Sequence, residues 1–147
     1  VVWTDCAITS ASWRKSRGGG GAMAKILVVD DEQRVVDLVA VNLRREGYTV
    51  VSARNGGDAL VAVGKEKPDL VILDVVMPVM DGVHVAQALK ANEATRDLPI
   101  VMLTAKAQDA DILEGLLAGA EVYLPKPFHP RDLIRVVKSL LPDPSRE

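Results

Sequence analysis

The sequence is short of the residues that build disulfide scaffolds and thiolate metal clusters. Among its 147 residues there is one cysteine, Cys6, and there are two histidines. A single cysteine excludes a disulfide within the chain and any metal site built from several cysteines, and it fits a reducing compartment. We therefore expect a soluble, cytoplasmic protein.

Long apolar runs and blocks of one charge are also missing. No stretch approaches the roughly 20 apolar residues that a membrane-spanning helix needs, and residues 1–17 lack the apolar core of a signal peptide. The 18 basic and 20 acidic residues are spread along the chain and leave a net charge of −2. The sequence predicts a protein that binds neither a membrane nor, by itself, nucleic acid.

Aromatic residues make up only 3% of the chain, whereas hydrophobic residues make up 48%. The core must therefore be aliphatic, which is typical of buried parallel strands covered by helices. A run of glycines at 18–21 separates two regions of different character. We expect a disordered N-terminal tail at 1–22, one domain at 23–141 and a short C-terminal tail at 142–147, with Met23 as the natural start.

The domain alternates between short apolar runs and amphipathic segments. Strands are predicted at 26–29, 48–53, 69–73, 98–103 and 121–124, and helices at 34–46, 57–67, 82–92, 109–118 and 130–141. Strands that alternate with helices form a parallel sheet with helices on both faces. The fold class predicted is α/β, a flavodoxin-like doubly wound sheet of five strands in the order 2-1-3-4-5.

Three acidic residues follow the first and third predicted strands, which are neighbours in this order. Asp30, Asp31 and Asp74 then converge at the carboxyl edge of the sheet. Crowded carboxylates disfavour joint ionisation, so the site calls for a cation. Mg²⁺ suits oxygen ligands of this kind. We expect it to bind Asp31 and Asp74, with Asp30 bound to the ion or to a metal-ligated water.

Two further polar residues end the other central strands. Thr104 and Lys126 face the same crevice in the predicted fold. A hydroxyl and an ammonium beside Mg²⁺ and carboxylates are suited to the charge of a transferring phosphoryl group. With this help a carboxylate can accept the phosphoryl group and form an acyl phosphate. Asp74 is the candidate nucleophile.

Four motifs in this order resemble the receiver domains of two-component response regulators, over about residues 24–141. They are Val-Val-Asp-Asp-Glu at 28–32, Asp74 with Met77-Pro78 and Met80-Asp81-Gly82, Leu-Thr-Ala at 103–105, and Tyr-Leu-Pro-Lys-Pro-Phe at 123–128. The given sequence leaves no length for an output domain after this region, so we expect a stand-alone receiver or a fragment of a longer regulator. Such a protein is a signalling switch rather than an enzyme that acts on other substrates.

The resemblance implies how the acceptor site works. Asp74 is expected to take a phosphoryl group from a histidine kinase or a phosphotransfer protein. Asp30, Asp31 and the backbone carbonyl of Val76 are expected to complete the Mg²⁺ ligands, and a cis bond is expected between Lys126 and Pro127.

The resemblance also implies an output. Thr104 and Lys126 contact the bound phosphoryl group, and Tyr123 moves inward as the helix at 109–118, the strand at 121–124 and the helix at 130–141 change for an unknown downstream partner. The protein is expected to be a monomer or a phosphorylation-dependent dimer. Val76 is too apolar to orient an attacking water and Lys106 can shield the phosphoryl group, so we expect an acyl phosphate that lasts minutes or longer.

Three other functions stay open at this stage. A flavodoxin shares the fold, but Asp30-Asp31-Glu32 would repel the phosphate of a flavin. A haloacid-dehalogenase-type phosphohydrolase also uses an aspartate and Mg²⁺, but places its nucleophile after strand one. A receiver that only binds partners, without phosphorylation, could carry the same motifs. His84 and His129 are each expected to be solvated surface residues.

Overall fold

The computed structural model describes residues 24–75, 82–104, 120–126 and 128–141. In chain order the elements are β1 (Lys25–Val29), α2 (Gln33–Arg45), β2 (Thr49–Ala53), α3 (Gly56–Glu66), β3 (Leu70–Asp74), α4 (Gly82–Ala91), β4 (Ile100–Thr104), β5 (Val122–Pro125) and α6 (Pro130–Leu140). The helix predicted at 109–118 and both predicted tails lie outside the described residues.

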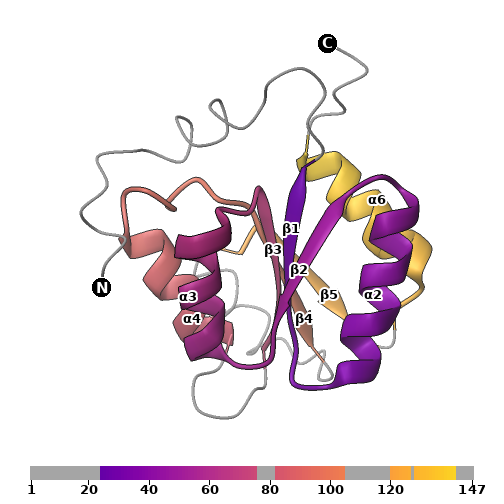
Figure 1. The fold of residues 1–147 in the computed structure, drawn as a ribbon, viewed down its shortest axis with the longest axis horizontal. Coiled ribbons are helices and arrows are strands. Elements are labelled where there is room, and N and C mark those ends of the chain that lie inside the picture. The colour runs from indigo at the N-terminus through magenta and orange to yellow at the C-terminus, as the bar shows by residue number, and fades with distance from the viewer. Residues whose placement is uncertain (1–23, 76–81, 105–119, 127, 142–147) are drawn as a thin grey trace.

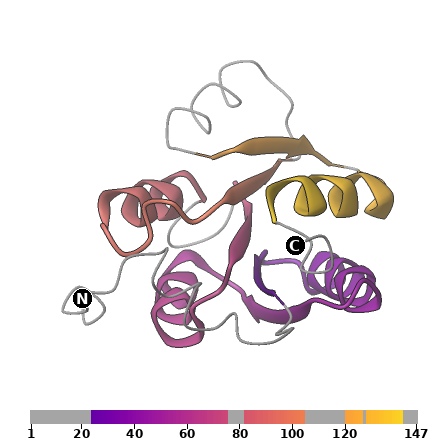
Figure 2. The same ribbon diagram turned by 90° about the horizontal axis from the view of Figure 1, so that it is seen from above.

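The strands form one parallel sheet in the order β2-β1-β3-β4-β5. The predicted flavodoxin-like order is therefore confirmed. In Figure 1 the sheet is seen between α3 and α4 on one side and α2 and α6 on the other, and Figure 2 shows the same layers from above. The register pairs Val29 with Ala53 and with Leu73, so the carboxyl ends of these strands meet at one edge.

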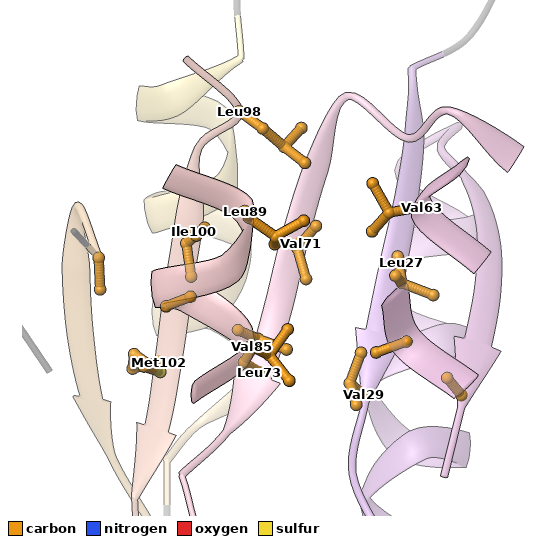
Figure 3. Close-up of a cluster of buried hydrophobic side chains, with 14 of the residues drawn as sticks. Leu27, Val29, Val63, Val71, Leu73, Val85, Leu89, Leu98, Ile100 and Met102 are labelled. Atoms are coloured by element: carbon orange, nitrogen blue, oxygen red, sulfur yellow. The ribbon is translucent and has the colours of Figure 1, made fainter. Parts of the chain in front are cut away.

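Alternation along the strands builds a separate core on each face of the sheet. Leu27 and Val29 belong to a cluster that includes side chains from α3 and α4, whereas Ile26 and Val28 belong to a cluster that includes side chains from α2 and α6. Figure 3 shows the first cluster, where Val63 of α3 and the α4 residues Val85 and Leu89 lie with the side chains of the central strands. The aliphatic composition thus fills both layers, as predicted.

Local signals account for where several helices begin and end. Gly47 follows the end of α2 and has a φ of 97°, in the left-handed region that glycine favours. The side chain of Asn55 accepts a hydrogen bond from the amide of Asp58 and caps the start of α3. Pro130 opens α6, where the missing amide hydrogen costs nothing.

Most predicted boundaries were wrong by one or two residues. Strand β4 begins at Ile100 rather than Leu98, because the amide of Leu98 donates to the carbonyl of Thr95 at 3.0 Å and so closes the preceding turn. Asp74 is the last residue of β3 instead of the residue after it, and Asp69 precedes that strand. Lys67 leaves α3 in the left-handed conformation, with a φ of 50°, rather than ending the helix.

None of the helices in the described ranges combines the length and the apolar character that crossing a bilayer requires.

Candidate functional site

Three carboxylates come together at the carboxyl edge of the sheet. Asp30 and Asp31 follow β1, and Asp74 ends β3, the neighbouring strand. Each offers one oxygen atom, and these atoms lie within 4.8 Å of one another. Asp30 is fully buried and Asp74 is 5% exposed, whereas Asp31 is open to solvent. The structure therefore brings together the three residues that the sequence analysis predicted.

Asp30 is held on three sides. Its amide donates to the carbonyl of Ala53 on β2 at 3.3 Å. Its Oδ1 accepts the amide of Glu32 at 2.9 Å, and its Oδ2 accepts the ammonium of Lys126 at 2.8 Å. Burying a carboxylate is costly unless it is paired and hydrogen-bonded. These bonds offset that cost and fix the position of the carboxylate.

Lys126 lies just after β5 and reaches across to this edge. Its Nζ is 3.5 Å from Oδ1 of Asp74 and 3.9 Å from Oε1 of Glu32, in addition to its bond with Asp30. Burial lowers the pKa of Lys126, but the hydrogen bond to Asp30 and the charges of Asp74, Asp30 and Glu32 outweigh burial and raise that pKa above its ordinary value. Lys126 is therefore a fixed positive charge.

The donor set fits a hard divalent cation. Three carboxylates carry more negative charge than the ammonium of Lys126 neutralises, and an exposed Asp31 leaves an entry from solvent. Oxygen ligands with room for water are what Mg²⁺ takes in proteins. No cysteine or histidine belongs to this group among the described residues, so a softer metal has no preferred ligand there.

Glycine is required where α4 begins. The amide of Gly82 donates to the carbonyl of Val75 at 2.9 Å, which brings the start of α4 onto the end of β3. A Cβ on Gly82 would overlap the carbonyl oxygen of Asp74. The absence of a side chain at Gly82 therefore allows the backbone approach that supports the Asp74 carboxylate.

Two other predicted site residues lie on the strands β4 and β5. Thr104 is the last residue of β4, and the strand register places its backbone beside Pro125. Tyr123 of β5 packs against the core on the α3 and α4 side, and its hydroxyl is buried with no hydrogen-bond partner among the described residues. Val76, Lys106 and Pro127 lie outside the described ranges, and with them the predicted cis bond.

The two histidines take no part in this site. His84 is exposed on α4. His129 is also exposed, and its Nδ1 accepts the amide of Arg131 at 3.0 Å, so it caps α6. Arg54, by contrast, was not singled out from the sequence although it bonds to the carbonyl of Asp31 at 2.8 Å. A single arginine after a strand belongs to no recognisable motif. The pairing of β2 with β1 is what places Arg54 beside Asp31.

A five-stranded parallel sheet with clustered carboxylates and a lysine at its carboxyl edge defines an α/β protein with an acidic site where such sheets bind their ligands. The family model of the response regulator receiver domain matches residues 26–138. The chain therefore belongs to the response regulator receiver domain family.

Curated relatives and solved structures agree with that family. The chain is 46% identical over 117 residues to the alkaline phosphatase synthesis transcriptional regulatory protein PhoP of Bacillus subtilis, a match that covers 80% of this chain and 48% of PhoP. It is 41% identical over 116 residues to the phosphate regulon transcriptional regulatory protein PhoB of Pseudomonas aeruginosa, covering 79% of this chain and 51% of PhoB. The chain thus spans about half the length of these curated relatives.

Among solved structures, the chemotaxis protein CheY4 of Vibrio cholerae is 37% identical, with a TM-score of 0.78, and the match covers 82% of this chain and all of CheY4. A putative response regulator from Chloroflexus aurantiacus is also 37% identical, with a TM-score of 0.77, covering 80% of this chain and 97% of that one. Both share the receiver fold over nearly their whole length.

Proposed function

We propose that this receiver is a phosphoacceptor switch in a two-component phosphorelay, with Asp74 as the residue that is phosphorylated. The observation that carries the proposal is the convergence of Asp30, Asp31 and Asp74 at the sheet edge, where Lys126 contacts Asp30 and Asp74. Asp74 is the member of this group that ends the central strand β3. Its carboxylate combines a fixed position with a nearby positive charge.

In this proposal Asp74 attacks the phosphorus atom of a phosphohistidine on a histidine kinase or a phosphotransfer protein. An oxygen–phosphorus bond forms to Asp74 as the phosphorus–nitrogen bond breaks, and the imidazole leaves with a proton from solvent. Lys126 neutralises charge that develops on the phosphoryl oxygens. Bound Mg²⁺, held by Asp30, Asp31, Asp74 and the carbonyl of Val76, would supply the remaining neutralisation.

The output is proposed to be a change of surface at the helix predicted at 109–118, at β5 and at α6. Thr104 would contact the phosphoryl group and Tyr123 would move with it, which shifts the population between two states. Tyr123 packs against the core on the α3 and α4 side and pairs with Met102 in the strand register, so its position can respond to a change at β4. Val76 and Lys106 are proposed to lengthen the life of the acyl phosphate.

The relatives named as transcriptional regulatory proteins suggest what the switch serves. They extend well beyond the length matched here, so we propose that the receiver signals through a protein surface rather than by contacting nucleic acid itself. The unknown partner would read the switched surface of a monomer or a phosphorylation-dependent dimer.

The test is phosphorylation of the purified chain by acetyl phosphate, followed by intact-protein mass spectrometry. We expect one phosphoryl group on the native chain with Mg²⁺ and none with a chelator. Asp74→Asn should abolish incorporation. Asp69→Asn is the matched control, because Asp69 precedes the same strand at its other end and accepts the amide of Lys25. Equal incorporation into Asp74→Asn and the native chain would overturn the proposal.

A further inference from the structure

An exposed arginine ties the loop that carries Asp31 to the neighbouring strand. Arg54 is the first residue after β2, and the register that pairs Val29 with Ala53 sets it beside the end of β1. Its Nη2 donates to the carbonyl of Asp31 at 2.8 Å, and its Nη1 donates to Oε1 of Gln33 at 2.7 Å. One guanidinium therefore bridges two points of the segment that leads from β1 into α2.

This bridge matters because the two adjacent aspartates are held very differently. Asp30 is buried and anchored through its amide and both carboxylate oxygens. Asp31 is exposed, and within the described part of the chain its carboxylate receives no hydrogen bond. The bond from Arg54 to its carbonyl is the polar contact that fixes the main chain of Asp31 from outside the loop.

The geometry of the bridge suits an arginine. The planar guanidinium presents several donors in a rigid fork, so it can hold two acceptors in one fixed arrangement, whereas a lysine offers a flexible point charge. Gln33 is itself oriented, because its Nε2 donates to Oδ1 of Asp37 one helical turn away at 2.7 Å. The bridge therefore continues into the first turns of α2.

We infer that Arg54 is a positioning residue for the Mg²⁺ site: by fixing the β1–α2 segment it keeps the Asp31 carboxylate within reach of Asp30 and Asp74. This inference rests on the proposed function, in which Asp31 is a metal ligand. Groups that orient metal ligands from outside contribute substantially to metal affinity.

The sign of the effect separates positioning from simple charge. A guanidinium beside a cation site repels the cation, so removing that charge alone would tighten Mg²⁺ binding. Loss of the bridge would instead loosen binding, because Asp31 would no longer be held in place. A neutral substitution at Arg54 thus moves affinity in opposite directions under the two explanations.

The experiment is a Mg²⁺ titration of the full chain by isothermal titration calorimetry. Arg54→Ala should weaken binding about tenfold, the lower end of the range for such residues because the contact is exposed. Arg54→Lys keeps the charge and should still weaken binding about threefold. Arg34→Ala is the matched control, since Arg34 is exposed on α2 with no hydrogen bond or ion pair to a described residue, and it should leave affinity unchanged or slightly higher.

A second readout needs no metal. In Mg²⁺-free protein, amide hydrogen exchange at Glu32 and the residues around it should be faster in Arg54→Ala, while the amides of β3 keep their protection. Saturating Mg²⁺ should restore the initial rate of phosphorylation by acetyl phosphate in Arg54→Ala, as expected for a residue that acts through metal affinity.

The outcomes separate this inference from the proposed function. If the native chain binds Mg²⁺ and Arg54→Ala binds it equally well or more tightly, the positioning role of Arg54 is overturned. The proposed function stays intact in that case. Native chain that binds no Mg²⁺ would overturn the metal site and this inference with it.

Discussion

The two edges of the sheet use charged residues in opposite ways. At the amino edge two lysines form ion pairs: Lys25 contacts Glu66 at 3.1 Å, and Lys90 contacts Glu121 at 3.0 Å. At the carboxyl edge Asp30, Asp31 and Asp74 each offer an oxygen atom within 4.8 Å of the others, and the ammonium of Lys126 contacts only Asp30 and Asp74 among them. The first arrangement joins elements together, and the second holds an excess of negative charge.

The partners at the amino edge show what such charges do for the fold. Lys90 at the end of α4 also donates to the carbonyl of Leu98 at 2.9 Å, and Glu121 accepts the amide of Ile100, which opens β4. These bonds satisfy backbone groups where strands begin. The carboxyl edge leaves like charges facing each other instead, which lowers stability and favours binding of a cation. The comparison is consistent with the proposal that the acceptor site lies at the carboxyl edge.

The largest effect should come from a steric change at the carboxyl edge. Gly82→Ala places a Cβ against the carbonyl of Asp74, so the end of β3 or the start of α4 must shift. We expect the free energy of unfolding to fall by about 3 kcal/mol and phosphorylation to be lost. Urea unfolding followed by circular dichroism measures the first effect.

The control for that substitution is Gly57→Ala in α3. A Cβ there would lie 3.4 Å from Oδ1 of Asn55, an ordinary contact, and alanine favours a helix. We expect unchanged or slightly higher stability. If both alanine variants unfold alike, the close approach at Gly82 does not constrain the site.

The next largest effect should come from replacing one lysine at each edge by alanine and comparing how far Mg²⁺ restores stability. Lys126→Ala leaves the carboxylates without their ammonium and should lower the free energy of unfolding by about 2 kcal/mol in Mg²⁺-free buffer. Millimolar Mg²⁺ should recover about half of that loss or more, because the ion supplies the missing positive charge.

Lys90→Ala should lower the free energy of unfolding by about 1 kcal/mol, with no recovery in Mg²⁺, since no group of three carboxylates that could hold the ion lies at the amino edge in the described part of the chain. Thermal unfolding of both variants with and without Mg²⁺ provides the measurement. Recovery of Lys90→Ala by Mg²⁺ would erase the difference between the two edges.

Removing one carboxylate from each edge should change stability in opposite directions. Asp31→Asn relieves repulsion and should raise the free energy of unfolding by about 1 kcal/mol without Mg²⁺. Glu121→Gln breaks the ion pair with Lys90 and should lower it by a similar amount, about 1 kcal/mol. Urea titrations at low ionic strength give both values. A loss of stability in Asp31→Asn would show that the crowded carboxylates do not repel.

The smallest effect concerns pH. The pKa of Lys126 is raised in the folded protein, so its contribution to stability is complete below the unfolded pKa of about 10.4 and is lost only as pH rises through the higher folded value. The stability difference between native chain and Lys126→Ala should therefore stay constant from about pH 7 to about pH 9. A difference that shrinks across this interval would place the pKa of Lys126 too low for a fixed charge.

The fold was predictable because the hydrophobic periodicity of the segments agreed with the glycine and proline residues at their ends. Five aliphatic runs separated by amphipathic segments favoured the five-stranded order 2-1-3-4-5, and Gly47 and Pro130 stood where one helix ended and another began. Predicted boundaries were less accurate where an apolar residue outside a strand packs into the core. Leu98 is fully buried, yet it precedes β4, so hydrophobicity alone extended the predicted strand.

The acidic site was predictable for a different reason. Parallel strands carry their last residues to one edge, so Asp30, Asp31 and Asp74 could be placed together without coordinates. The contacts of Arg54 were not predictable in that way, because its role depends on strand register and on side-chain reach. The asparagine cap at Asn55 did leave a signal, since Asp58 follows three residues later as in a capping motif.

The most direct test of the proposed acceptor site is to find which residue carries the phosphoryl group. Chain phosphorylated by acetyl phosphate with Mg²⁺ is reduced with borohydride, which converts an aspartyl phosphate to homoserine, and its peptides are sequenced by mass spectrometry. We predict homoserine at Asp74 and at no other aspartate. Homoserine at Asp30 or Asp31, or at Asp69 on the amino edge, would contradict the assignment of Asp74 as the acceptor.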